Sequence, residues 1–240
     1  QPVDGRPNCE RELLFEIIEI GAVKLNEKRE KIGEFSELIR PVVYHKLNWH
    51  TQKMLKLKMA DLRDKRSFPE VFESFINWCG EDAVFCSWGS QDLTELQRNM
   101  RYHKMSPLGK GPIAYYDVQK LYAIQREEEE VHRNLETAVD LMGMEKDIPF
   151  HRAYGDAYYT AKIFAKLDKQ IIEEHISYDL FRIPASEKEE IKEFHGKEYQ
   201  LITCGYKERT DVSENRKIIT MNCYLCNNRS IRPKVRWFST

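Results

Sequence analysis

Hydrophobic and polar residues alternate with a period of two near the start of the chain. In residues 13–25, Ile18 and Ile20 share one face, and the other face carries both polar and apolar side chains. This pattern is typical of a strand that is partly buried on both sides. Residues 32–40 alternate in the same way, and the short polar link between the two runs predicts an antiparallel hairpin.

Two shorter apolar runs, residues 83–88 and 113–118, favour buried strands. Cys86 lies in the first run and is interpreted as a small core residue. Helical periodicity predicts helices over residues 48–58, 67–79, 91–102, 118–126, 134–142, 153–169 and 171–181. Ser67 and Glu70 add a capping-box pattern at one helix start. The order of the elements predicts a mixed α/β sheet with helices on both faces.

The stretch HRAYGDAYYTAK places His151 in a loop and Asp156 in the first turn of a helix that begins near Ala153. On one continuous helix these two side chains would point about 140° apart. A histidine in the preceding loop can instead curl over the helix start and share a site with Asp156. Imidazole and carboxylate together suit general-base and metal-ligand chemistry. The alternative is a surface histidine beside an aspartate that the helix dipole favours.

Asp92 occupies a comparable position, because it follows the strand at residues 83–88 and lies at the start of the next helix. Open α/β sheets bind their ligands at the carboxyl ends of their strands. A binding role and a simple favourable charge at a helix start both remain possible from this position alone.

Composition narrows the class of protein. The 240 residues include 38 basic and 39 acidic side chains, for a net charge of −1, so any nucleic-acid site must be a local patch or a cleft neutralised by metal. No apolar run approaches the length of a membrane span, and no signal-peptide pattern opens the chain. Six scattered cysteines do not form a disulfide framework, and we expect reduced thiols in a cytoplasmic protein.

Four segments together resemble the DnaQ-like 3′-to-5′ exonucleases of the DEDDh family. They are EIIEIGAV (16–23), SWGSQDLTEL (87–96), YYDVQKLY (115–122) and HRAYGDA (151–157). The resemblance covers roughly residues 13–168 and implies a ribonuclease-H-like fold. It also implies hydrolysis of single-stranded RNA or DNA from the 3′ end, with release of 5′-mononucleotides.

The resemblance assigns roles to individual residues. Asp92 and Asp156 match acids that hold two divalent ions, Mg²⁺ or Mn²⁺, and His151 matches the general base. Asp117 looks like a helix-capping acid and is not placed on metal. Trp49, Trp88 and Tyr154 are candidates to stack on a terminal base, although aromatic side chains at such positions are also often core residues.

The family's first motif, an Asp-x-Glu at the end of a strand ahead of EIIEIGAV, is not found between Gln1 and Leu13. We expect the intact protein to carry such a strand immediately before Gln1. The alternative is an inactive relative that binds nucleic acid or regulates another protein.

The last seventy residues change character. We expect an exonuclease domain over residues 1–170 and a charged appendage over residues 171–240, with strand-like pieces at 199–204 and 217–221. Cys223 and Cys226 form a C-x2-C pair, half of a zinc ribbon. Either a partial Zn²⁺ site or free thiols would explain this pair. The sequence does not indicate an oligomeric state.

Overall fold

The computed structural model divides the chain into two compact units, residues 1–182 and 183–240. It describes residues 13–128, 130–195, 198–222 and 229–231. Within this part of the chain, no helix is both long and apolar enough to cross a membrane.

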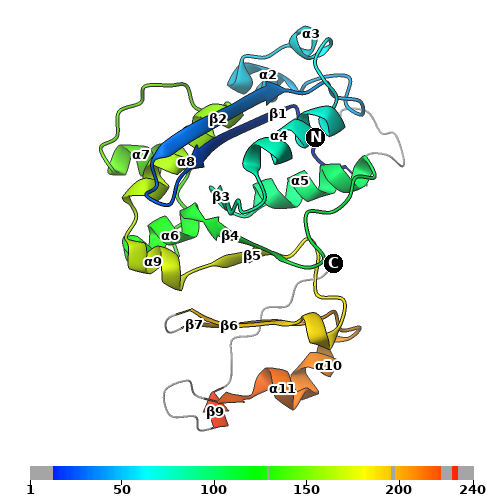
Figure 1. The fold of residues 1–240 in the computed structure, drawn as a ribbon, viewed down its shortest axis with the longest axis vertical. Coiled ribbons are helices and arrows are strands. Elements are labelled where there is room, and N and C mark those ends of the chain that lie inside the picture. Colours follow the sequence, from blue (N-terminus) through cyan, green and yellow to red (C-terminus); the bar gives the residue numbers. More distant parts are fainter. Residues whose placement is uncertain (1–12, 129, 196–197, 223–228, 232–240) are drawn as a thin grey trace. The chain divides into compact units, whose positions relative to one another are not determined.

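The first unit contains two small sheets and most of the helices (Figure 1). Its strands are β1 (Glu19–Leu25), β2 (Lys31–Leu38), β3 (Phe85–Ser87), β4 (Ile113–Asp117) and β5 (Ser177–Asp179). Its helices are α2 (Trp49–Leu55), α3 (Met59–Leu62), α4 (Phe68–Cys79), α5 (Gln91–Tyr102), α6 (Val118–Gln125), α7 (Leu135–Leu141), α8 (Ala153–Lys166) and α9 (Lys169–Glu174). The capping box that Ser67 and Glu70 predict is present at the start of α4.

The predicted hairpin is present, because β1 and β2 pair antiparallel with Ala22 opposite Phe35. In the second sheet β3 runs parallel to β4, and β5 pairs antiparallel with the other edge of β4. The helix predicted over residues 171–181 is wrong in its second half. Helix α9 ends at Glu174, and Ile176 and Tyr178 then alternate with polar neighbours, which is the period of a strand.

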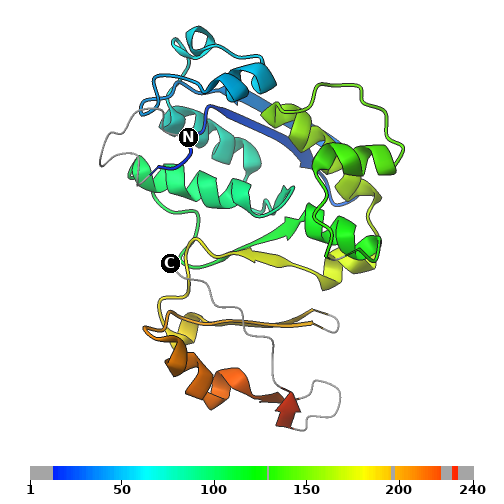
Figure 2. The same cartoon turned by 180° about the vertical axis from the view of Figure 1, so that it is seen from behind.

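Helices cover both faces of the two sheets (Figures 1 and 2). On one face, α4 and α5 pack on a core that takes side chains from both sheets, including Ile20 of β1, Phe85 of β3 and Tyr115 of β4. On the other face, a second core joins α6, α7 and α8, and α8 contacts β1, β2 and β3. The predicted class, a ribonuclease-H-like mixed sheet flanked by helices, is confirmed.

The edges of β1 and β3 form a seam between the two sheets. Among the described residues β1 pairs only with β2 and β3 only with β4, and both views show β3 as the strand of its sheet nearest to β1. Cys86 of β3 was expected in the core but is exposed. The protein around it nevertheless raises the pKa of its thiol to about 12 by desolvation. Water therefore reaches Cys86 although protein atoms surround much of its thiol.

The second unit is built from short elements. They are a 3₁₀ turn (Glu187–Glu189), β6 (Ile191–His195), β7 (Glu198–Ile202), α10 (Arg209–Glu214), α11 (Arg216–Ile219), β8 (Met221–Asn222) and β9 (Arg229–Ile231). Strands β6 and β7 form an antiparallel hairpin, as do β8 and β9. The strand predicted over 217–221 is largely wrong, because α11 covers most of it, and a run this short does not distinguish the two periods. Cys223 and Cys226 lie outside the described residues.

Candidate active site

The start of α8 forms the first half of the candidate site. Helix α8 begins at Ala153, and Asp156 lies in its first turn, as the sequence predicts. The backbone N–H of His151 donates a hydrogen bond of 3.0 Å to Oδ1 of Asp156. His151 has a φ of +65° and an exposed side chain. The histidine and the aspartate are therefore brought together, through the backbone of one and the side chain of the other.

Two glycines allow the chain to pack closely around this turn. A Cβ atom on Gly21 of β1 would lie 2.1 Å from the backbone N of Tyr154 and 2.3 Å from the carbonyl carbon of Ala153. A Cβ atom on Gly155 would lie 2.1 Å from the carbonyl oxygen of Pro149. Because such distances are far inside van der Waals contact, only glycine lets β1 and the loop approach the first turn of α8.

An ion pair that sequence reasoning did not find joins β1 to the same turn. The guanidinium of Arg152 donates to the carboxylate of Glu19, from Nε at 3.0 and 3.2 Å and from Nη2 at 2.8 Å. The backbone N–H of Ala153 donates to Oε2 of Glu19 at 3.4 Å. The only signal in the sequence is a charged residue inside the apolar strand IIEIGAV.

Asp92 forms the second half of the site. Strand β3 ends at Ser87, the chain turns at Gly89 with a φ of +95°, and α5 begins at Gln91. The Asp92 side chain is reached by solvent but lies among protein atoms. This desolvation, together with the negative charges of Asp156 and Asp117, raises its pKa to about 6.

Asp156 and Asp117, whose charges act on Asp92, lie in different surroundings. Burial raises the pKa of Asp156 and the charge of Glu19 adds to the rise, whereas the hydrogen bond and charge of His151 oppose it. Asp117 accepts a hydrogen bond of 3.1 Å from the backbone N–H of Lys120. It therefore caps α6, which is the structural role that the sequence suggests.

The donor set of Asp92 and Asp156 suits a hard divalent cation, since carboxylate oxygens are the ligands that Mg²⁺ and Mn²⁺ prefer. A cation between them would also relieve the repulsion that raises the pKa of Asp92. Among the residues that the structure describes, no group of three or more His, Cys, Asp or Glu side chains could hold a metal ion. These two aspartates therefore fit a metal ion as part of a ligand set.

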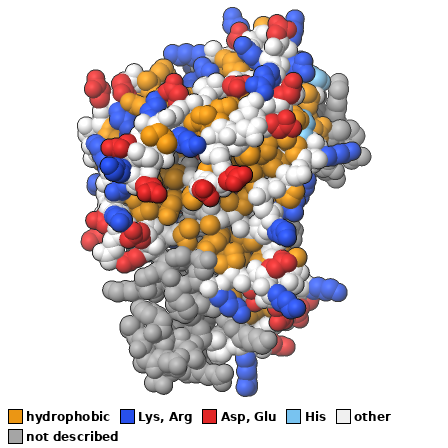
Figure 3. Space-filling view, in the orientation of Figure 1, with side chains coloured by type: hydrophobic (Ala, Val, Ile, Leu, Met, Phe, Trp, Pro, Cys, Tyr) orange, Lys and Arg blue, Asp and Glu red, His pale blue; other side chains and the backbone are white. Residues whose placement is uncertain are grey.

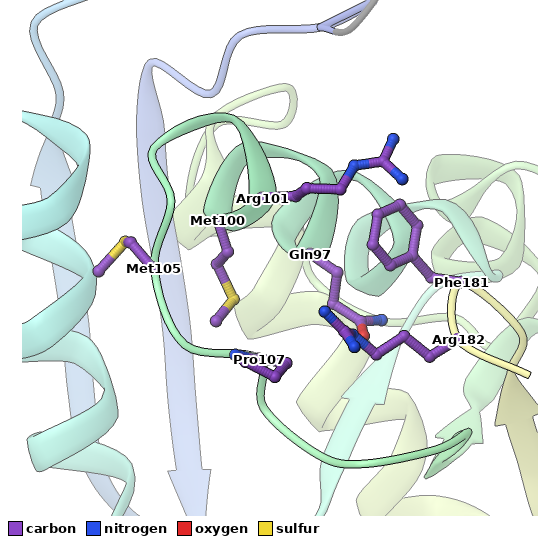
Figure 4. Close-up of a pocket in the computed structure, with 7 residues that line it drawn as sticks. All are labelled: Gln97, Met100, Arg101, Met105, Pro107, Phe181 and Arg182. Atoms are coloured by element: carbon purple, nitrogen blue, oxygen red, sulfur yellow. The ribbon is translucent and has the colours of Figure 1, made fainter. Parts of the chain in front are cut away.

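Helix α5, which carries Asp92, is anchored by a buried carboxylate. Asp179 at the end of β5 accepts hydrogen bonds of 2.5 Å from Oγ1 of Thr94 and from Nε2 of Gln97, and one of 3.0 Å from the backbone N–H of Phe181. A cavity of about 10 Å³ lies beside Gln97 (Figure 4). It has room for one water molecule at most, so it is not a substrate site.

A larger groove, of about 460 Å³, begins at Glu19 and Arg152 and reaches the turn between α3 and α4. Its charged lining residues are Glu19, Glu37, Asp64, Lys65, Arg66 and Arg152. Three acidic and three basic side chains cancel, so the groove alone offers little attraction to a phosphate backbone. The described residues on the face in Figure 3 likewise show acidic and basic side chains interspersed.

The three aromatic candidates lie in different surroundings. Trp49 on α2 is 64% exposed, with the ammonium of Lys53 5.2 Å from its ring centre. Trp88 packs on Tyr122, and its indole N–H donates to the carbonyl of Arg133 at 3.2 Å.

Tyr154 turns toward β2, where its hydroxyl donates to Glu34 at 2.8 Å and accepts from Lys31 at 2.9 Å. The polar ends of Trp88 and Tyr154 are therefore engaged within the protein, whereas most of the surface of Trp49 is exposed to solvent.

Comparison with known proteins places this site in a family context. A model of the RNase T exonuclease family matches residues 12–164. The nuclease domain of 3′hExo, a DEDDh family member bound to rAMP, is 20% identical, with 74% of this chain and 91% of that chain covered and a TM-score of 0.61. A full-length 3′-exonuclease is 18% identical, with 85% and 86% covered and a TM-score of 0.61.

A 3′-exonuclease in a structure of 3′-end specific recognition of a histone mRNA stem-loop is 16% identical, with 85% and 67% covered and a TM-score of 0.59. No curated protein matches the chain. At these identities the solved structures show a shared fold. The family model, in contrast, spans more than half of the chain, so the chain belongs to the RNase T exonuclease family of DnaQ-like, DEDDh-type nucleases.

Proposed function

We propose that this nuclease is a metal-dependent 3′-to-5′ exonuclease that releases 5′-mononucleotides from single-stranded RNA or DNA. The observation that carries the proposal is the convergence of Asp92 and Asp156, which come from different helices yet share one electrostatic field. His151 lies at the turn beside them, with its backbone bound to Asp156. Two acids and a histidine at the carboxyl end of β3 have the composition that phosphodiester hydrolysis requires.

Asp92 and Asp156 would hold divalent ions, Mg²⁺ or Mn²⁺, through their carboxylate oxygens. Two such ions stabilise the attacking and leaving oxygens of a phosphodiester displacement. The raised pKa of Asp92 supports this assignment, because burial and the negative charges of Asp156 and Asp117 raise it, and a bound cation would offset both.

We propose that the remaining ligands come from a strand in the seam between β1 and β3, carrying an Asp-x-Glu motif. Both strands have an edge that pairs with no described residue. A strand in this position would satisfy backbone groups on both sides and would lie beside Asp92. It would also cover Cys86, which water now reaches.

His151 would act as the general base. Its side chain is exposed, so it can face a substrate, and an imidazole nitrogen can accept a proton. It would take the proton of the attacking water. The hydrogen bond from its own backbone to Asp156 fixes the place from which the ring reaches the reacting phosphate.

The substrate would be the 3′ end of a nucleic-acid strand. Trp49 is our candidate for stacking on a base, because its ring is exposed and Lys53 adds a positive charge beside it. Roles for Trp88 and Tyr154 in binding stay predictions. RNA deserves the first trial, since rAMP and a histone mRNA stem-loop are the ligands of two proteins with the same fold.

The test uses the protein together with any residues that its gene encodes ahead of Gln1. This protein is incubated with single-stranded RNA or DNA labelled at the 3′ or the 5′ end. We expect Mn²⁺- or Mg²⁺-dependent release of single 5′-nucleotides from the 3′ end, and no release with chelator. Tight binding of the strand without cleavage would contradict the proposal and favour an inactive binding protein.

A further inference from the structure

In the ion pair between Glu19 and Arg152, the carboxylate is almost completely buried and the guanidinium is partly exposed. The Glu19 side chain is 6% exposed, whereas that of Arg152 is 36% exposed. Arg152 uses its planar fork to bind both oxygens of the carboxylate. Such a two-pronged contact fixes the direction of both side chains as well as their distance.

Arg152 directly follows a residue held in an unfavourable conformation. His151 has a φ of +65°, a region that residues with a Cβ atom enter only at a cost in free energy. Such a conformation persists when the surroundings determine it. Here the bond to Asp156 acts on the N–H of His151, and the bond to Glu19 acts on the next residue.

The face of β1 forms a shelf for this turn. Glu19 and Gly21 are two residues apart on one strand, so their side-chain positions lie on the same face. Glu19 binds Arg152 and the N–H of Ala153, and Gly21 lies against the backbone of Ala153 and Tyr154. Strand β1 therefore binds the turn through the charge of Glu19, and it allows close packing because Gly21 has no side chain.

We propose that Glu19 and Arg152 are positioning residues, which hold the His151 turn so that its imidazole meets the reacting phosphate. They touch neither the substrate nor the reacting atoms. This inference rests on the proposed function, because it presumes that His151 acts in the reaction. Its geometric part, that the pair holds the turn, can be measured without any activity.

The first measurement is hydrogen exchange of the backbone amides in the full chain, compared between wild type and the variants Glu19→Gln and Arg152→Lys. Glu19→Gln keeps the shape of the side chain and removes its charge, and Arg152→Lys keeps the charge and removes the fork. We expect the His151 amide to exchange roughly tenfold faster in both variants, with β4 and α5 unchanged.

Glu95→Gln is the matched control. Glu95 and Arg98 form an ion pair of 3.0 Å whose side chains are each about one-fifth exposed, between the values for Glu19 and Arg152, but the pair lies within α5. This variant should leave exchange at His151 unchanged. Equal exchange in wild type, Glu19→Gln and Arg152→Lys would overturn the positioning role, as would faster exchange spread evenly over the whole first unit.

The second measurement is the split between kcat and KM for cleavage. We expect kcat to fall roughly tenfold to a hundredfold in Glu19→Gln, with KM nearly constant, because misplacing a catalytic group affects the transition state more than binding. A raised KM with constant kcat would contradict the proposal. A wild-type protein without nuclease activity would instead contradict the proposed function, and the exchange measurement would still decide whether the pair holds the turn.

Discussion

The two halves of the candidate site differ in how completely the protein itself satisfies their charges. On the α8 side, Glu19 is paired with Arg152, Asp156 accepts the N–H of His151, and two glycines let the backbones pack without a gap. On the α5 side, Asp92 lies among carboxylates that raise its pKa, beside the seam where β3 has an edge without a described partner. The α8 half is held by contacts within the protein, whereas we propose that Asp92, together with Asp156, receives a cation.

This difference separates the groups that hold the geometry of the site from the groups that are proposed to bind the metal ion. An ion pair such as Glu19 with Arg152 holds the geometry of the turn. A carboxylate with a raised pKa costs the folded protein free energy until a cation or a proton arrives. The predictions below alter one half at a time, so that each effect can be assigned to geometry or to charge.

The largest effect should come from the group that performs the proton transfer. His151→Ala should lower kcat by about 10²–10⁴-fold, the range that a general base contributes. Binding of a single strand should remain nearly unchanged, because the exposed side chain contributes little to the packing of the site. Single-turnover rates and a binding titration on the same preparation would measure both quantities. Wild-type cleavage by His151→Ala would refute the assignment of the base.

The next prediction concerns the first half of the site alone, where β1 packs on the first turn of α8. Gly21→Ala should lower the free energy of unfolding by about 3 kcal/mol, because its new methyl group would lie inside the backbone of Ala153 and Tyr154. Gly111→Ala is the control, since a Cβ there meets no other atom within 4 Å. Urea unfolding of both variants would measure the difference. Equal stability of the two would show that α8 yields easily, and that this half is less rigid than its contacts imply.

The same comparison shows where sequence reasoning succeeds. Asp92 and Asp156 could be predicted because each sits at a helix start, and helix starts are encoded by a few neighbouring residues. The hairpin and the capping box at Ser67 are local in the same sense. Local patterns therefore predicted these elements and the positions of the two aspartates, whereas their proposed roles came from the family resemblance.

What the sequence could not supply depends on contacts between distant segments. Glu19 and Arg152 are 133 positions apart, and nothing in either segment specifies the other as its partner. Cys86 lies in an apolar run that predicts burial, yet it is exposed, because burial depends on what pairs with the edge of β3 that has no partner among the described residues. The sequence predicts a helix through β5 because the alternating run around Ile176 and Tyr178 is too short to distinguish a strand from a helix.

A smaller effect should appear when one metal ligand is neutralised. Asp156→Asn should weaken Mn²⁺ binding by roughly tenfold, because the amide keeps an oxygen but loses the charge. It should also loosen the His151 turn slightly, since a neutral acceptor binds the N–H less strongly. Titration of Mn²⁺ by electron paramagnetic resonance would measure the affinity. Unchanged affinity would remove Asp156 from the proposed ligand set.

The smallest effect concerns Asp92, in the second half of the site. Here we expect a substitution to raise the stability of the protein. The pKa of Asp92 is raised from 3.8 to about 6 in the folded protein. Below about pH 4 Asp92 is protonated in both the folded and the unfolded protein, so it does not change the free energy of unfolding. Between the two pKa values only the unfolded protein releases the proton, so stability falls as the pH rises. Above about pH 6 the penalty is fully present, and Asp92→Asn removes it.

Without metal, Asp92→Asn should therefore stabilise the protein at neutral pH by about 1 kcal/mol, a value well below the full shift because solvent reaches the side chain. Thermal unfolding should show a rise in Tm of about 2–4 °C, and this gain should vanish below about pH 4. Adding Mn²⁺ should reverse the order of the two proteins, because only wild type can use the charge to bind the ion. A variant that is less stable than wild type without metal would show that Asp92 is already satisfied by the protein, and the contrast between the two halves would be lost.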